Sequence, residues 1–180
     1  MSHFYFVSGK KDFSVFDKYL KEAINRKQDV IQKIIKRSLS IKKRFIEKDE
    51  FDKNEKIILN YGHSFGHAIE KITNFKIPHG IAVANGMNIA NFASFKMKYI
   101  DKNQFTKMGF TLDRLLGNDK LKKFKTDELI KALKKDKKNL KGSIRLILTK
   151  GLGKMFVKKI NNPNRLRDIL IDYQNTLRHK

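Results

Sequence analysis

Apolar side chains recur at helical spacing along the first part of the chain. Between residues 12 and 48 neither proline nor glycine interrupts the pattern, which predicts two helices or one long bent helix. A further helix is expected to begin near Ile57 or after Gly62 and to run through Ile72. This part of the chain is therefore predicted to be mainly helical, with apolar stripes that face a core.

Two interruptions divide the predicted helices. Residues 49–55, with the sequence DEFDKNE, indicate a polar loop, and residues 74–78 indicate a break that ends in proline. Another helix is expected to follow Gly80 and to continue toward Met97. Small residues in this helix permit close packing against a neighbour, namely Ala82, Ala84, Gly86 and Ala90.

The last part of the chain has a different pattern. Residues 143–149 alternate apolar and polar positions and predict a short strand, and a glycine-rich turn leads into a second strand at 155–160. Thr126 is expected to cap a helix, and Pro163 suits the first turn of a final helix. The predicted fold class is mainly α, with one small β-hairpin, in a single domain that takes up all 180 residues.

The composition narrows the classes of protein to consider. The chain has no cysteine, which excludes disulfides and thiolate metal sites and fits a reducing compartment. Its apolar runs fall far short of the roughly 20 residues that span a bilayer, and its N-terminus lacks the order of a secretion signal. We therefore expect a cytoplasmic protein without a membrane partner.

The net charge of +23 indicates a polyanionic partner, and nucleic acid is the first candidate. However, the basic residues are spread along the chain instead of forming one block. They are also mostly lysine, whereas bidentate contacts to phosphate or guanine favour arginine. A solvated basic surface is therefore the favoured interpretation, and a non-catalytic nucleic-acid-binding module stays as an alternative.

Three of the five histidines lie within one short stretch of the sequence. His63 and His67 are four residues apart, so a helix would present both on one face. His79 follows a proline and precedes a glycine, at a constrained junction between a loop and a helix. Imidazole is the commonest neutral metal ligand, so this spacing suggests a metal site as well as a pair of packed or surface histidines. Gly62 and Gly66 bracket the pair and let a ligand or another backbone approach closely.

Two neighbouring segments carry a family resemblance. The stretch LNYGHSFGHAIE at 59–70, followed by HGIAVANGM at 79–87, resembles the signature of 3-dehydroquinate synthases and related sugar-phosphate cyclases. Supporting matches are SIKKRFIEKDE at 40–50 and DKKNLKGSIRLILTKGLGK at 136–154. The resemblance implies the helical C-terminal domain of a dehydroquinate-synthase-like fold. The NAD-binding N-terminal domain has no counterpart here, and no strand, glycine-rich loop and helix unit is encoded.

The resemblance also implies roles for particular residues. His63 and His79 take the positions of metal ligands, for Zn²⁺ or another divalent metal such as Co²⁺. His67 takes the position of a histidine beside the substrate phosphate and the proton-transfer path. Asn60 and Lys42 take the positions of a substrate-binding asparagine and lysine.

Further positions are implied to contact the anionic substrate: Lys56, Lys137 or Lys138, and His3. Lys56 stands where the family usually has arginine, which weakens the geometry of a phosphate or carboxylate contact. His3 falls near the lysine of an upstream E-x-x-K pattern, whose glutamate would be the third metal ligand and would precede Met1. His3 is therefore expected to contact substrate or to take a ligand role. Ile81 replaces a family glutamate beside His79, which removes a carboxylate near a ligand.

The implied activity is that of a carbon–oxygen lyase of the shikimate pathway. It is a metal- and NAD-dependent cyclisation of a seven-carbon sugar phosphate with elimination of phosphate. The chain is expected to be a fragment that is inactive alone, with the NAD-binding half or a separate chain as partner and a homodimer as its assembly. Besides the nucleic-acid module, a related sugar-phosphate cyclase and a metal-dependent polyol dehydrogenase are alternatives.

Overall fold

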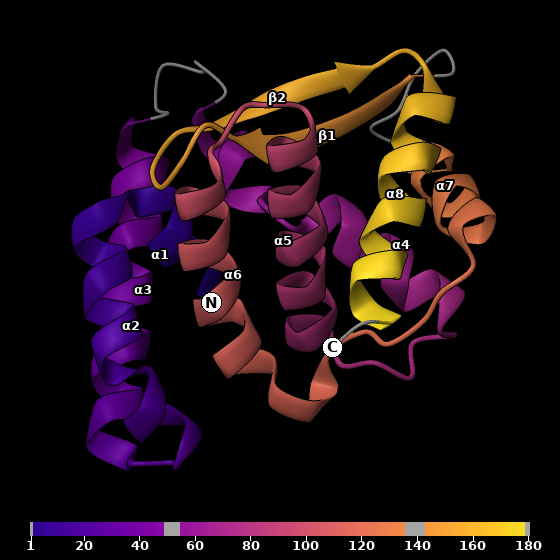
Figure 1. Ribbon diagram of the computed structural model, residues 1–180. Coiled ribbons are helices and arrows are strands. Elements are labelled where there is room, and N and C mark those ends of the chain that lie inside the picture. The colour runs from indigo at the N-terminus through magenta and orange to yellow at the C-terminus, as the bar shows by residue number, and fades with distance from the viewer. Residues whose placement is uncertain (1, 49–54, 136–142, 179–180) are drawn as a thin grey trace.

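The computed structural model describes residues 2–48, 55–135 and 143–178. These residues form a layer of helices with one two-stranded sheet across one end (Figure 1). The α-helices are α1 (Ser2–Ser8), α2 (Lys10–Ile24), α3 (Gln28–Lys48), α4 (His63–Ile72), α5 (His79–Lys96), α6 (Lys102–Leu116), α7 (Thr126–Lys134) and α8 (Pro163–Arg178). Two short 3₁₀ helices, η2 (Glu55–Asn60) and η3 (Gly117–Asp119), and two strands, β1 (Ile144–Thr149) and β2 (Met155–Ile160), complete the described elements.

The mainly α fold with one small hairpin is confirmed. The pattern at 12–48 forms two helices, α2 and α3, and α4, α5 and α8 begin close to where the sequence placed them. The sequence did not predict α1 and α6. The predicted loop at 49–55 lies almost wholly outside the described residues.

Thr126 does not cap α7, as the sequence had suggested. It is the first residue of the helix, Lys125 precedes it, and no side chain caps this end. The Thr126 hydroxyl instead accepts a hydrogen bond of 2.6 Å from the Gln174 side-chain amide on α8. The threonine thus joins two helices instead of starting one.

Helix α5 is the centre of the core. Every residue from 82 to 94 is buried, so this helix has no solvent-facing side along most of its length. It contacts α4, α6, α8 and β1, and Figure 1 shows it between α6 and α8 with the hairpin across its end. No described helix is long and apolar enough to cross a membrane.

Glycines bring α4 and α5 into backbone contact. A methyl group on Gly86 of α5 would overlap the carbonyl oxygen of Gly62 and would lie 2.7 Å from the backbone nitrogen of Gly66. A methyl group on Gly66 would lie 3.0 Å from the α-carbon of Val83. Because only glycine leaves room for this approach, these positions determine how closely the two helices cross.

The hairpin holds α1 and α5 in place. Its strands pair antiparallel, with Ile144 opposite Ile160 and Thr149 opposite Met155. The Thr149 N–H donates to the Ser94 hydroxyl on α5 at 3.1 Å. The Gly153 N–H in the turn donates to the carbonyl of Phe6 at 2.9 Å, which ties α1 to the hairpin.

A buried carboxylate joins α2 to α3. Asp12 accepts a hydrogen bond of 2.8 Å from Arg37 Nε and one of 3.2 Å from Arg44, and the Ser8 hydroxyl also donates to it. Burial by itself would raise the pKa of this carboxyl, but the hydrogen bonds from Ser8, Arg37 and Arg44 outweigh burial and hold the pKa below its ordinary value.

We expect Gly86→Ala to lower the free energy of unfolding by about 1–3 kcal/mol or more, because the added methyl group meets backbone atoms that cannot move aside. Gly109→Ala on α6 is the matched control, since a methyl group there meets nothing within 4 Å. The control should be as stable as the wild type or up to about 1 kcal/mol more stable. Urea unfolding measures both, and equal stabilities of the two variants would contradict the close contact.

We expect Asp12→Asn to cost about 1–3 kcal/mol at pH 7, because two arginines lose a charged acceptor. The pKa of the folded carboxyl is lowered, so its contribution is complete above the unfolded value of about 3.9 and is lost as pH falls through the folded pKa. Urea unfolding of both proteins from pH 7 down to pH 3 should show the difference shrinking. A difference that stays constant with pH would argue against this account.

Candidate metal centre

The crossing of α4 and α5 brings the three clustered histidines together. His63 and His79 are the first residues of α4 and α5, and His67 lies one turn along α4. The ring centres of His63 and His79 are 5.5 Å apart, and that of His67 is 5.8 Å from each of them. Gly62 precedes α4 with a φ of 81°, a left-handed conformation that suits glycine.

Two of these imidazoles have one ring nitrogen satisfied by the protein. His63 Nδ1 lies 3.4 Å from the carbonyl oxygen of Tyr61, and His79 Nδ1 lies 3.0 Å from Oε1 of Glu70. When Nδ1 donates its hydrogen to such an oxygen, Nε2 is left as a lone-pair donor for a metal. Both histidines therefore have the arrangement that metal-ligating histidines commonly show.

Burial keeps His63 in the form that binds metal. It lowers the pKa of His63 to about 4, so the imidazole is neutral at pH 7. Metal ligation requires a neutral imidazole, since a protonated ring has no free lone pair. The same burial that packs His63 against the core thus prepares its donor nitrogen.

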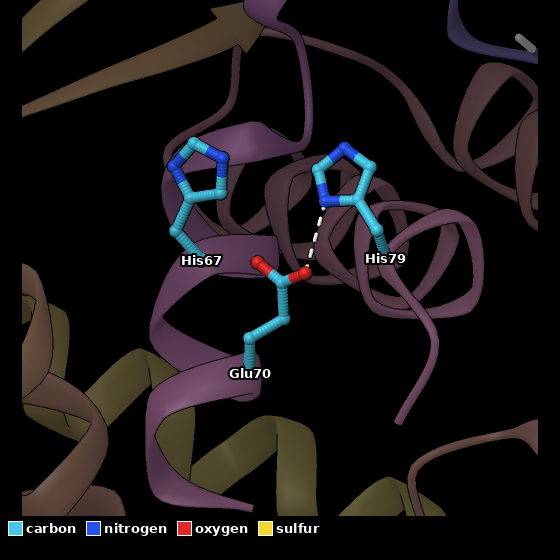
Figure 2. A group of neighbouring side chains, drawn as sticks. All are labelled: His67, Glu70 and His79. Atoms are coloured by element: carbon cyan, nitrogen blue, oxygen red, sulfur yellow. Dashed lines mark hydrogen bonds and ion pairs between the residues drawn. The ribbon is translucent and has the colours of Figure 1, made fainter. Parts of the chain in front are cut away.

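Glu70 also belongs to the cluster, although the sequence pattern did not single it out. This residue lies on α4 three positions after His67, so the two share a helix face, and its carboxylate stands between the rings of His67 and His79 (Figure 2). Donor atoms of His67, Glu70 and His79 all lie within 4.8 Å of one another. The signal was present in the GHAIE stretch, but the spacing within α4 does not reveal the contact with α5.

A carboxylate beside His79 is therefore present, although Ile81 replaces the glutamate that the family resemblance led us to expect. Glu70 supplies it from the neighbouring helix. The Ile81 side chain itself lines an apolar groove of about 540 Å³, bounded by the start of α5 and by α2 and α3.

His3 also lies beside the cluster. Its ring centre is 4.8 Å from that of His63 in an edge-to-face contact, and the side chain is buried. Burial lowers the pKa of His3 to about 2, so this ring is neutral. Its Nδ1 has no hydrogen-bond partner among the described residues. The structure thus places His3 against the site, and its role in binding substrate or metal stays a prediction.

The other predicted site residues lie on η2 and α3 or outside the described part. Asn60 ends η2, three residues before His63, and its side-chain amide donates to the carbonyl of Ile57 at 3.2 Å. Lys42 on α3 and Lys56 in η2 are exposed. Lys137 and Lys138 lie outside the described residues. Their predicted contacts with substrate stay predictions.

The histidine donor set fits a divalent metal. Two imidazoles on one tetrahedral zinc ion have ring centres roughly 5 Å apart, because each Zn–N bond is about 2 Å long, and His63 and His79 approach this spacing. The His79 side chain is 57% exposed, so one side of the cluster is open to an incoming molecule. An open side is what distinguishes a catalytic metal site from a structural one.

A separate cavity of about 610 Å³ lies between α6 and α8 and has no histidine in its lining. Its polar side chains include Asp113 and Lys120, which form an ion pair of 2.7 Å. Because the groups able to do acid–base or metal chemistry gather at the α4–α5 crossing, we place the functional site there and not in this cavity.

Comparison with known proteins gives a consistent result. The family model of the 3-dehydroquinate synthase C-terminal domain matches residues 3–139. The chain is 38% identical to the 3-dehydroquinate synthase of Dictyoglomus thermophilum, over 79% of this chain and 40% of that protein. It is also 38% identical to that of Clostridium perfringens, over 82% of this chain and 43% of the relative. The chain thus spans about two fifths of the length of these relatives.

Solved structures share the fold. A 2-epi-5-epi-valiolone synthase from Streptomyces hygroscopicus, with NAD⁺ and Zn²⁺ bound, superposes with a TM-score of 0.77 at 17% identity, over 99% of this chain and half of that one. A 2-deoxy-scyllo-inosose synthase complexed with carbaglucose-6-phosphate, NAD⁺ and Co²⁺ gives a TM-score of 0.68 at 23% identity, over 78% of this chain and 40% of that one. With the family match over most of its length, the chain belongs to the family of the 3-dehydroquinate synthase C-terminal domain.

Proposed function

We propose that this chain forms the metal-binding wall of a 3-dehydroquinate synthase active site. The reaction would be the cyclisation of a seven-carbon sugar phosphate with elimination of phosphate. One observation carries the proposal. In a chain of this family, the ring centres of His63 and His79 lie 5.5 Å apart, and each ring has its Nδ1 facing a protein oxygen. Their Nε2 atoms are therefore available to one divalent ion.

The comparisons support this choice over the alternatives. The relatives named above are called 3-dehydroquinate synthases, whereas the two solved cyclases resemble the chain in fold at lower identity. Both solved cyclases contain NAD⁺ and a divalent metal, and one contains a sugar-phosphate analogue. Lys56 and Ile81 depart from the family pattern, so a related sugar-phosphate cyclase is the second candidate.

The residues of the cluster have separable roles in this proposal. His63 and His79 would hold the metal, which would act as a Lewis acid on a substrate hydroxyl. His67, one turn from His63, would contact the substrate phosphate and relay a proton, since an imidazole can both accept and donate one. Asn60 would orient a substrate hydroxyl.

Lysines would hold the anionic groups of the substrate. Lys42, Lys56 and either Lys137 or Lys138 are the proposed contacts, and an ammonium group binds phosphate as a point charge without the fixed geometry of arginine. These few lysines account for only a small part of the net charge of +23. That the chain pairs as a homodimer stays a prediction.

NAD would be bound mainly by another part of the enzyme. The described residues contain no parallel strands and no glycine-rich loop between a strand and a helix, which is the unit that binds a dinucleotide pyrophosphate. Because the chain spans about two fifths of its relatives, we assign NAD binding to the remaining part of such a protein, in a longer polypeptide or in a separate one.

We expect the purified chain to bind one equivalent of Zn²⁺ or Co²⁺ and both His63→Ala and His79→Ala to lose it, because each removes one of two ligands. Equilibrium dialysis with metal analysis measures the stoichiometry, and circular dichroism checks that the variants fold. His179→Ala, a histidine outside the described residues, controls for loss of any one imidazole. Full binding by the two cluster variants would contradict the assignment.

We expect no carbocyclic product from the 180-residue chain with Zn²⁺, NAD⁺ and the seven-carbon sugar phosphate. Adding the NAD-binding half of the Dictyoglomus thermophilum enzyme should restore phosphate release, if the two halves form one cleft. Steady turnover by the chain alone would contradict the assignment of NAD binding to another part of the enzyme. Reduction of NAD⁺ without phosphate release would instead indicate a polyol dehydrogenase.

A further inference from the structure

We propose that Glu70 is a positioning residue of the metal centre. Its carboxylate accepts a hydrogen bond from Nδ1–H of His79 and holds this ring so that Nε2 is directed at the metal. The inference rests on the proposed function for the metal itself, whereas the link between Glu70 and His79 stands on the geometry of the two side chains.

The two groups come from different helices and meet at 3.0 Å, between His79 Nδ1 and Glu70 Oε1. The Glu70 side chain is only 12% exposed. Removing a carboxylate from water is costly unless it gains a hydrogen-bonding partner, and His79 is the partner that the structure provides. The contact thus compensates for burying the charge and also bridges α4 and α5.

His79 depends on this contact more than His63 depends on its own. The His79 side chain is 57% exposed, so packing alone does not determine how its ring is turned. His63, in contrast, is half-buried and faces the carbonyl of Tyr61. One ligand is therefore oriented by burial and backbone, and the other by the Glu70 carboxylate.

Glu70 has a second conceivable role, as a direct metal ligand with His67 and His79, because the donor atoms of all three lie within 4.8 Å. The view in Figure 2 favours positioning. The Glu70 carboxylate lies toward the backbone end of the His67 and His79 side chains. The second ring nitrogen of His79, Nε2, points away from the carboxylate. A metal held by Nε2 would lie on the open side of the ring. The carboxylate, bonded to Nδ1 on the opposite side, would hold the orientation of the ring without contacting the metal.

Metal affinity tests the proposal with graded variants. Glu70→Ala should weaken Co²⁺ binding about 10- to 100-fold, as loss of such a partner commonly does. Glu70→Gln keeps an acceptor oxygen but loses the charge, so its loss of affinity should be smaller. Both variants should still bind one equivalent and show the visible absorption spectrum of Co²⁺ in the wild type, because the ligands are unchanged.

Glu128→Gln is the matched control for lost negative charge. Glu128 lies on α7, is exposed, pairs with Lys125 at 2.9 Å, and does not belong to the histidine cluster. Its removal should leave Co²⁺ affinity unchanged. Thermal unfolding of each metal-free variant establishes that Glu70→Ala and Glu70→Gln remain folded.

A second measurement needs no metal. Nitrogen NMR of the metal-free protein should show His79 with its hydrogen on Nδ1 in the wild type and in Glu70→Gln, and should show that preference lost in Glu70→Ala. If the wild-type chain binds no metal, the proposed function fails while this result still decides whether Glu70 orients the ring.

Three results would overturn the inference. They are a hydrogen on Nε2 of His79 in the metal-free wild type, an affinity of Glu70→Ala within about twofold of the wild type, or loss of the metal equivalent with a changed Co²⁺ spectrum. The last result would make Glu70 a direct ligand instead of a positioning residue.

Discussion

The contact between α4 and α5 is the constraint on which the rest of this structure depends. It is made by backbone, because Gly86 has no room for a side chain against Gly62 and Gly66. The crossing it permits buries α5 on every side and fixes where both helices begin. His63 and His79 are the first residues of these helices. The packing that forms the core therefore also brings the two histidines together.

Burial and hydrogen bonding both prepare the histidines of this site to bind a metal. Burial keeps the His63 imidazole neutral, which a metal ligand requires, and Nδ1 of His63 and Nδ1 of His79 each lie beside a protein oxygen. The exposed side of His79 leaves space for an incoming molecule. The fold therefore offers prepared metal donors on one side, and under the proposed function the facing side of the site would come from the part that the longer relatives contain.

Much of this could be predicted from local pattern. Helical periodicity located α2 to α5 and α8, alternation located the hairpin, and the spacing of His63 and His67 placed both on one face. Two helices were missed for different reasons. Helix α1 is a continuous apolar run without a period, while α6 carries a capping box, formed by Asp101 and Gln104, that the sequence analysis did not use.

The sequence by itself determined which segments are helical, where proline and glycine interrupt them, and that three histidines fall near two helix starts. Only the tertiary structure decided that Glu70 of α4 supports His79 of α5, and that His3 lies against His63 from sixty positions away. The physical reason is that periodicity is a property of neighbouring residues, whereas a contact between helices depends on how closely they cross. Here that distance is set by Gly62, Gly66 and Gly86, which let the two backbones come into direct contact.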